Sequence, residues 1–330
     1  MHVIAPGTSV AKQIERDPET RNLLVHRAGG SALFGWPGAV ANVKTNPLLL
    51  AHAGPFAVAV RRQLDAVGHV DRVIGHWIVP AGVPLLWDHP APLEVVAHGA
   101  DVRLLCALPR PLRCALVEAL LERAARFRFV ASTLLQTLGR NLPSGIEARL
   151  VSASYVEPAA IELPDVSTRA RELRASTYVQ TGGFVVAVGR LIELKRFELA
   201  IRSAASANVP IVIVGDGPLR TQLEDVARET RARATFTGLL SRKETLAWIA
   251  ASRALVHPSR TEAAPTVVRE ARALGVPVIA TSSGDIAVWA RADLGIVVVD
   301  PSSEALAQAL GALGVGSRTS NETSAHPELF

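Results

Sequence analysis

The sequence predicts an α/β protein with two doubly wound parallel sheets in series. The chain has 330 residues, which is enough for two ordinary domains with separate cores. Its hydrophobic content of 49% is that of a well-packed globular protein. Short β-branched runs alternate with helical patterns, and strands that are apolar along nearly their whole length are typical of parallel sheets buried on both faces. Together these features favour the doubly wound arrangement.

The second half of the chain shows the alternation most clearly. Four helical patterns separate five β-branched runs, and they lie at 196–206, 218–230, 242–252 and 266–274. The strands are expected at FVVAV (184–188), IVIVG (211–215), ALVHP (254–258), PVIAT (277–281) and GIVVV (295–299).

The first half follows the same plan with less regularity. Helices are expected near 56–66 and 111–128, and strands at HVIAP (2–6), RVIGHW (72–77) and LEVVAH (93–98). The polar, charged stretch 164–180 suits an interdomain connection, and the Ser/Thr-rich end is expected to be disordered. The predicted domains are therefore 1–165 and 166–313, followed by a tail at 314–330.

Positive charge is concentrated in residues 102–140. This segment has seven arginines against two glutamates, an excess of five that equals the net charge of the whole chain. Such a segment can steer an anionic substrate or rest on an anionic membrane, although a solvated helical face explains it as well. Leu112, Leu116, Leu120 and Phe127 follow one helical side with Arg123 among them. No nucleic-acid-binding motif is present, so nucleic acid is not an expected partner.

The remaining composition favours a cytoplasmic protein. The longest apolar stretch, 73–87, is too short and too interrupted to span a bilayer, and no signal-peptide pattern opens the sequence. Cys106 and Cys114 match neither a zinc nor a redox spacing, so we expect reduced core thiols. The basic segment leaves open a peripheral contact with the inner face of the plasma membrane.

Glycines and cations follow the predicted strands of the second half. Gly189 and Arg190 come directly after the first strand, Lys195 follows five residues later, and Gly238–Leu239 follow a short strand at 235–238. A glycine at a strand end lets backbone approach a ligand, and the two cations can reach an anion there. Because ligands of doubly wound sheets bind at the carboxyl ends of the strands, these residues predict a binding edge. Each signal alone also fits ordinary turns and surface charges.

The stretch TEAAPTVVREA (261–271) adds two carboxylates and a helix start. Pro265 favours the first helical position, so the backbone N–H groups near Ala264, Pro265, Thr266 and Val267 form an anion site at the positive end of the helix dipole. Glu262 stands in the loop before that end, and Glu270 lies on the side of Thr266, beside an apolar stripe at Val267, Ala271 and Leu274. Alternatively, Glu262 complements the dipole and Glu270 is an ordinary flanking charge.

Two cations, a helix N-terminus and two carboxylates suit a ligand with a diphosphate between two polyols, which is a nucleotide-sugar. The residues 181–311 resemble glycosyltransferase family 4, the retaining nucleotide-sugar enzymes of GT-B fold, in which two Rossmann-like domains face each other across a cleft. The likeness rests on VGRLIELKRFELAI, IVIVGDGPLRTQLE, and the glutamate–seven–glutamate spacing that begins in PSRTE. The resemblance implies that Arg190 and Lys195 bind the diphosphate, that Glu262 faces the transferred sugar, that Glu270 binds the ribose, and that Gly238–Leu239 lies against the nucleobase.

The first domain resembles the same family more loosely, at GHWIVPAG (75–82) and VVAHGADVRLL (95–105). The resemblance implies an acceptor-side domain in which His98 lies beside the donor sugar and phosphate, with Asp101 shaping the loop. His76 is either structural or on the acceptor side. Family members open with a further strand and a glycine-rich loop, whereas MHVIAPG resembles their second strand. The N-terminal sheet is therefore expected to lack its first, central strand, which would expose sheet edges.

The implied reaction is hexosyl transfer with retention, from a UDP- or GDP-sugar to a glycan, lipid or small-molecule hydroxyl, within cell-envelope or polysaccharide biosynthesis. No Asp-x-Asp pair is present, so we expect neither metal nor cofactor, with Arg190, Lys195 and the helix end neutralising the diphosphate. Two alternatives remain open: a noncatalytic nucleotide-sugar binding protein and a GT-B sugar-nucleotide epimerase.

Overall fold

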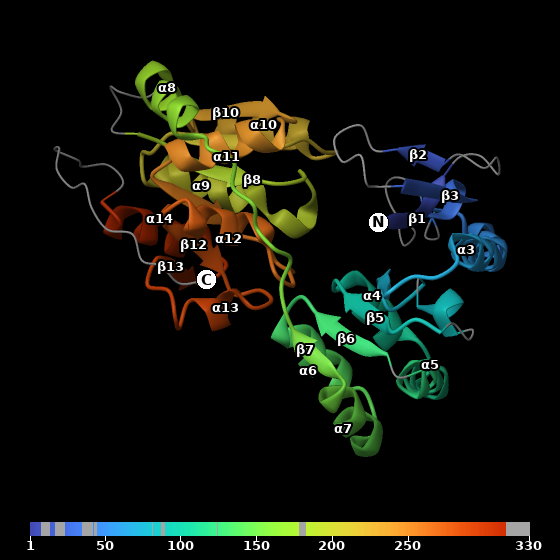
Figure 1. Ribbon diagram of the computed structural model, residues 1–330. Helices are drawn as coiled ribbons and strands as arrows, with labels where there is room; N and C mark the ends of the chain where they lie inside the picture. Colours follow the sequence, from blue (N-terminus) through green and yellow to red (C-terminus); the bar gives the residue numbers. More distant parts are fainter. Residues whose placement is uncertain are drawn as a thin grey trace. The chain divides into compact units, whose positions relative to one another are not determined.

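The computed structural model describes residues 1–7, 14–16, 24–34, 42, 45–80, 82–86, 90–123, 125–177 and 183–314. The chain divides into two compact units, Met1–Pro158 and Ala159–Phe330, whose elements are labelled in Figure 1. The division falls a few residues before the boundary expected at 165. The predicted disorder of the tail concerns residues that, from 315 onward, lie outside the described ones.

The second unit contains one six-stranded sheet in the order β10-β9-β8-β11-β12-β13, and all its strand pairs are parallel. All five strands predicted for this half are present, and the short strand before Gly238 is present as well. The strands are β8 (Val185–Val188), β9 (Ile211–Val214), β10 (Ala234–Gly238), β11 (Ala254–His257), β12 (Val278–Thr281) and β13 (Ile296–Val299).

Helices bury both faces of this sheet (Figure 1). Val185 and Ala187 of β8 point into one apolar cluster with Ile201, while Val186 of the same strand points into the other with Val268. This alternation explains why the strands are apolar at consecutive positions. The helical elements are α8 (Ser167–Thr177), η4 (Glu193–Lys195), α9 (Phe197–Ser206), α10 (Arg220–Glu229), α11 (Arg242–Ala251), α12 (Thr266–Ala273), α13 (Ile286–Trp289) and α14 (Ser303–Ala312).

The stretch expected as a polar connection is largely helical. Helix α8 occupies 167–177, and its residues Ala170 and Leu173, with Val166 before it, are buried in the second unit. Three apolar positions at helical spacing were therefore enough to dock a segment whose composition is otherwise charged. Residues 178–180 of the expected connection lie outside the described residues.

The described strands of the first unit form two separate sheets. In the first sheet β1 pairs with β3 in parallel and β2 pairs with β3 antiparallel, and the second sheet is parallel throughout in the order β4-β5-β6-β7. Among the described residues, β1 and β4 each lie at the edge of their sheet. The strands are β1 (His2–Gly7), β2 (Ile14–Arg16), β3 (Leu24–Gly30), β4 (Val73–His76), β5 (Leu93–Ala97), β6 (Arg126–Phe129) and β7 (Ser154–Val156).

The four-stranded sheet is apolar on one face and mixes apolar with charged residues on the other. Val95, Phe127 and Phe129 are fully buried, whereas the alternate positions along the same strands carry Glu94 and Arg128. The helical elements of this unit are α1 (Ser31–Phe34), η1 (Pro47–His52), α3 (Ala53–Val67), η2 (Val83–Leu86), α4 (Ala100–Ala107), α5 (Arg110–Glu122), α6 (Ser132–Gly139) and α7 (Ser144–Ser152).

The helix expected over 111–128 was wrong in its extent and in its apolar side. Helix α5 ends at Glu122, and Phe127 belongs to strand β6. Its buried positions are Arg113, Val117 and Leu120, while Leu112 is 50% exposed. The misassignment followed from reading two elements as one amphipathic pattern. No helix among the described residues has the length and apolarity needed to cross a membrane.

Candidate active site in the second unit

The centre of the predicted site is Glu262, in the loop that follows strand β11. Its Oε1 forms an ion pair with Nζ of Lys195, which lies at the end of η4, after strand β8. Strands β8 and β11 are neighbours in the sheet. Their carboxyl ends therefore bring together two residues that are 67 positions apart, and the edge predicted from the sequence carries a cation and a carboxylate in contact.

His257 is a further member of this cluster that the sequence reading did not single out. It is the last residue of β11, its side chain is 2% exposed, and its Nε2 lies 3.5 Å from Oε1 of Glu262. Burial lowers the pKa of His257 despite the neighbouring carboxylate, so the ring is neutral near pH 7. In the sequence, His257 was indistinguishable from the end of a buried strand, because only the fold shows that Glu262 turns back toward it.

Glu262 is held ionised by its two neighbours. Burial on its own would raise the pKa of the carboxyl, but the approach of the His257 ring and the charge of Lys195 outweigh burial and lower the pKa to about 2. The group is therefore a carboxylate at any pH near neutrality. A fixed negative charge at the carboxyl edge of the sheet can accept hydrogen bonds from sugar hydroxyls or stabilise a developing positive charge.

The loop that carries Glu262 is fixed to neighbouring elements. Arg196, whose φ of 47° is in the left-handed region, donates from Nε to the carbonyl of Pro258 at 2.8 Å. Thr281 donates to the carbonyl of Ser259 at 2.8 Å. Gly284 (φ 55°) packs against Ala263 so closely that a Cβ would lie 2.0 Å from its carbonyl oxygen. The backbone around Glu262 is therefore held at several points.

Glu270 is paired with an arginine that the sequence analysis did not name. It lies in helix α12 and is 7% exposed, and its Oε1 forms an ion pair with Nη1 of Arg242 at 2.8 Å. Arg242 is the first residue of α11, and its Nη2 also donates to the carbonyl of Glu162 at 3.0 Å. A buried carboxylate is expected to be paired. Arg242 lies 28 positions before Glu270, however, and no sequence pattern links two residues at that separation.

Helix α12 begins at Thr266, as expected, but two details differ. Pro265 is the residue that caps the helix and not its first residue, with φ −64° and ψ 112°. Of the predicted stripe, Ala271 is fully buried, and Val267 and Leu274 are half-buried against the same apolar cluster; Val268, which was not predicted, is fully buried as well. The start of α12, with Ala264 before it, still presents the first amides of a helix, which have no intrahelical partner.

Three glycine turns meet at the ends of β8, β9 and β10. The amide of Gly189 donates to Val214 at 3.0 Å, and the amide of Gly215 donates to Gly238 at 2.9 Å. A Cβ on Gly215 would lie 2.0 Å from the carbonyl oxygen of Gly189, so only glycine fits there. Next to these turns, Arg190 is exposed and Leu239 is 80% exposed, which leaves both side chains accessible to a ligand.

Candidate residues in the first unit

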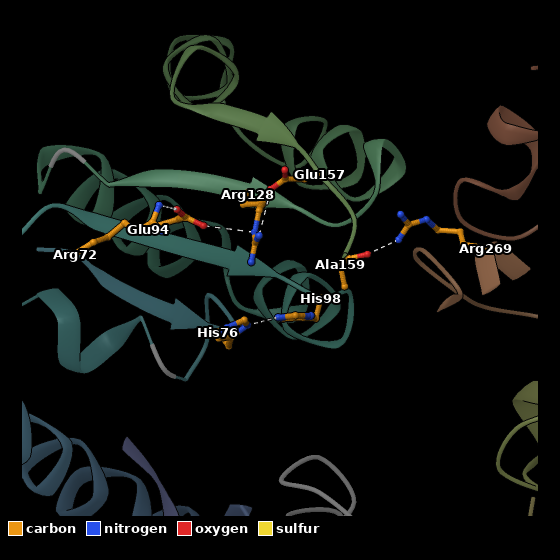
Figure 2. A network of polar contacts seen from close by, with 8 residues as sticks. All are labelled: Arg72, His76, Glu94, His98, Arg128, Glu157, Ala159 and Arg269. Atoms are coloured by element: carbon orange, nitrogen blue, oxygen red, sulfur yellow. Dashed lines mark hydrogen bonds and ion pairs between the residues drawn. The ribbon is translucent and has the colours of Figure 1, made fainter. Parts of the chain in front are cut away.

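The two candidate histidines of the first unit are in contact. His76 ends strand β4 and His98 follows the neighbouring strand β5, and Nδ1 of His76 lies 2.9 Å from Nε2 of His98 (Figure 2). Burial is the first cause that lowers the pKa of each ring, and nearby cations contribute in the same direction. Both rings are therefore neutral at pH 7, and one donates its N–H to the other.

Asp101 fixes the loops that carry these histidines. Its carboxylate is fully buried and accepts hydrogen bonds from three backbone amides: Ile78 at 2.9 Å, His98 at 3.0 Å and Gly99 at 2.8 Å. Ile78 belongs to the loop after β4, and the other two belong to the loop after β5. One side chain therefore joins both loops, which agrees with the shaping role that the family resemblance implies for Asp101.

Several arginines of the basic segment serve packing within this unit. Arg113 is buried and donates to the carbonyls of Cys106, Leu108 and Asn141 at 3.0 Å each. Arg128 lies 3.4 Å from Glu94, which also pairs with Arg72 at 3.2 Å (Figure 2). The excess of five positive charges therefore does not form one free surface. The exposed arginines of the segment are Arg103, Arg110, Arg126 and Arg140.

Among the described residues there is no group of three or more His, Cys, Asp or Glu side chains that could hold a metal ion.

Comparison with known proteins

Residues 169–314 match the family described as Glycosyl transferases group 1. A GDP-mannose-dependent alpha-mannosyltransferase of Mycolicibacterium smegmatis is 37% identical over 118 residues, which are 36% of this chain and 30% of that protein. The chain spans about a third of the length of the curated relatives it matches. The family match lies within the second unit.

Solved structures extend the similarity to the fold of the whole chain. Sucrose-phosphate synthase from Thermosynechococcus elongatus superposes with a TM-score of 0.69 at 20% identity, covering 96% of this chain and 80% of that one. HepE from Anabaena, solved in complex with UDP and glucose, has a TM-score of 0.61 at 17% identity and covers 78% of this chain and 71% of its own. At this identity the likeness concerns the fold, which is GT-B.

The fold and the matched segment together support a GT-B glycosyltransferase as the class of this protein. Within that class, the similarity in sequence is to the group 1 glycosyl transferases and lies in the unit that contains Glu262 and Glu270.

Proposed function

We propose that this chain is a metal-independent, retaining glycosyltransferase that moves a sugar from a nucleoside-diphosphate donor to a hydroxyl group of a glycan, lipid or small molecule. The observation that carries the proposal is the cluster of Glu262, Lys195 and His257 at the carboxyl edge of a doubly wound sheet. It offers a permanent carboxylate beside a cation within a segment similar to the group 1 glycosyl transferases.

In this proposal the donor lies along the strand ends of the second unit. Arg190, Lys195 and the first amides of α12 neutralise the diphosphate, as cations and helix N-termini do at phosphate sites. Glu270 binds the ribose hydroxyls, and its carboxylate is paired with Arg242. The exposed Leu239 covers one side of the nucleobase. UDP and GDP are the nucleotides we favour, because HepE was solved with UDP and the mannosyltransferase relative uses GDP-mannose.

The transfer step follows from the charges in this arrangement. As the bond between the sugar and the diphosphate lengthens, positive charge develops on the sugar and negative charge on the leaving phosphate oxygen. Lys195 and Arg190 stabilise the phosphate, and the Glu262 carboxylate stabilises the sugar cation without a covalent bond. The leaving phosphate oxygen accepts the proton of the acceptor hydroxyl on the same face, so the configuration is retained. For His98 of the first unit, whose ring is neutral at pH 7, contact with the donor stays a prediction of the family resemblance.

The test uses the purified chain with UDP-glucose and GDP-mannose. We expect binding by calorimetry, slow release of nucleoside diphosphate in the presence of EDTA, and transfer once an acceptor is supplied. Lys195→Ala and Arg190→Ala should each weaken donor binding by about 10- to 100-fold, the effect of one hydrogen bond to a charged group. Arg202→Ala, an exposed arginine of α9, is the matched control. Unchanged donor binding and turnover in both variants would refute the assignment.

A noncatalytic nucleotide-sugar binding protein is the second candidate, because the strands of the first unit form two separate sheets. Binding of nucleotide-sugar without nucleotide release or transfer would support it. Recovery of an isomerised donor would instead indicate an epimerase.

We also propose a cytoplasmic location with peripheral membrane contact through Arg103, Arg110, Arg126 and Arg140. These side chains are exposed, and an anionic lipid surface attracts such cations. Sedimentation with anionic vesicles, and its absence with neutral ones, would support this contact.

A further inference from the structure

The buried imidazole of His257 has one nitrogen without a hydrogen-bond partner among the described residues. Its side chain is 2% exposed and its Nε2 meets no other polar atom within hydrogen-bond geometry. The nearest acceptor is Oε1 of Glu262 at 3.5 Å, slightly beyond an ordinary hydrogen bond. A polar atom buried without a partner is unfavourable, so a histidine in this place needs a reason beyond packing.

Lys195 competes for the same oxygen atom. Both Nζ of Lys195 and Nε2 of His257 approach Oε1 of Glu262. In the proposed donor complex, Nζ of Lys195 also donates hydrogen bonds to the diphosphate, and its contact with Oε1 of Glu262 weakens. When the lysine moves toward the phosphates, His257 is the remaining contact of Oε1, because the ring is buried at the end of β11 beside it.

We propose that His257 is a positioning residue for Glu262, which donates its Nε2–H to Oε1 and holds the carboxylate toward the transferred sugar while Lys195 engages the diphosphate. The inference rests on the proposed function. It assigns to one buried side chain the task of keeping Glu262 in place at the moment when its ion pair with Lys195 weakens.

Histidine suits this task because it can donate a hydrogen bond without carrying charge. The ring is buried at the end of β11, and a neutral donor leaves the negative charge of Glu262 available to the sugar. A lysine or arginine in the same place would neutralise that charge. The geometry requires one tautomer, with the proton on Nε2 and the lone pair on Nδ1.

The tautomer can be measured in the ligand-free protein. In a uniformly ¹⁵N-labelled chain, the ring nitrogens of His257, identified by their loss in His257→Gln, should show the neutral Nε2–H tautomer at pH 7. Glu262→Ala should shift these resonances, and Glu229→Ala, on the exposed end of α10, should leave them unchanged. A proton on Nδ1, or ring resonances that are the same in Glu262→Ala and in the wild type, would overturn the proposal. This result does not depend on the binding of any donor.

Two substitutions separate positioning from packing in the presence of a donor. His257→Leu fills the site without a donor group, and His257→Gln places an amide N–H near the position of Nε2. The leucine variant should lower kcat by about 10- to 100-fold, the effect of one hydrogen bond to a charged group, and the glutamine variant by about 5-fold or less. The leucine variant should also lose the affinity difference between GDP-mannose and GDP, or between UDP-glucose and UDP, while its affinity for the free nucleotide changes little.

The outcomes distinguish the two levels of the proposal. If the wild-type chain binds nucleotide-sugars and the leucine variant behaves like it, the role of His257 is overturned and the proposed function stands. Equal losses of affinity for the nucleotide and the nucleotide-sugar would assign His257 to packing and overturn its positioning role. A wild-type chain that binds none of these nucleotides overturns the proposed function and, with it, the role of His257.

Discussion

The two units use the carboxyl ends of neighbouring strands in the same way but bury charge differently. In the second unit, Lys195 and Glu262 follow the adjacent strands β8 and β11. In the first unit, His76 and His98 follow the adjacent strands β4 and β5. In both units, residues far apart in sequence meet because their strands are hydrogen-bonded neighbours.

The difference lies in the sheets themselves. The sheet of the second unit is apolar on both faces and keeps charged groups at its edge and in the surrounding helices. The four-stranded sheet of the first unit carries Glu94 and Arg128 in the middle of its strands, and the strands of this unit form two sheets. The charged pair described for the sheet of the second unit therefore lies at the strand ends, whereas in the first unit an ion pair also joins neighbouring strands.

The largest expected effect concerns the edge of the second unit. Glu262→Gln keeps the shape of the side chain and removes its charge, so transfer should fall by about 10³-fold if the carboxylate stabilises the sugar cation. Binding of the free nucleoside diphosphate should remain. Glu229→Gln is the control, and turnover is measured as nucleotide release with each donor. A loss below about 3-fold in Glu262→Gln would place the essential charge elsewhere.

The next effect concerns the clamp of the first unit. Asp101→Ala removes the acceptor of three backbone amides from a fully buried place, so we expect a loss of about 3 kcal/mol or more in the stability of this unit. Asp65→Ala, on the exposed surface of α3, should change it by less than about 0.5 kcal/mol. Amide hydrogen exchange reports the change directly, since Ile78, His98 and Gly99 should exchange faster. Unchanged protection of all three amides would show that the loops are fixed without Asp101.

The acid dependence of stability provides a third test, again at Glu262. Its pKa is about 2 in the folded protein against an ordinary 4.5, so ionisation stabilises the fold above pH 4.5, and the contribution is lost as the pH falls toward 2. At neutral pH this linkage amounts to about 3 kcal/mol. Denaturation of the wild type should therefore lose more stability between pH 6 and pH 3 than denaturation of Glu262→Gln. Parallel pH profiles for the two proteins would contradict the depressed pKa.

The smallest expected effect concerns the partner of Glu270. Arg242→Ala leaves a nearly buried carboxylate unpaired, and we expect a loss of about 1–2 kcal/mol in stability. The affinity for nucleoside diphosphates should fall as well, because Glu270 is the proposed ribose ligand. Lys243→Ala, the exposed neighbour on the same helix, is the matched control in urea denaturation and calorimetry. If both variants behave alike, Arg242 is only a surface residue.

Most of the second unit could be predicted from the sequence because its strands are consecutively apolar. FVVAV, IVIVG and PVIAT have no other plausible place than a sheet buried on both faces, and the strand order then places Lys195 and Glu262 at one edge. His257 and Arg242 were missed for a physical reason. Each acts through a partner that only the folded chain brings near, and neither has a local pattern.

The first unit was harder to predict because its strands mix charges with apolar residues. RFRF (126–129) alternates arginine with phenylalanine and was read as the end of a helix, although Arg128 is neutralised by Glu94 on the neighbouring strand. Strand β7, Ser154–Val156, is too short to carry a pattern. Pairing across strands, which decides both elements, is not visible along the chain.

The close packing of Gly284 against Ala263 has a consequence for how the site can respond to a donor. Arg196 and Thr281 fix the same segment from other directions. Any exchange of partners by Glu262 must therefore occur through rotation about its own side-chain bonds, with the main chain acting as a rigid template. Association with a donor would then require little ordering of this segment, and its entropic cost would be correspondingly small.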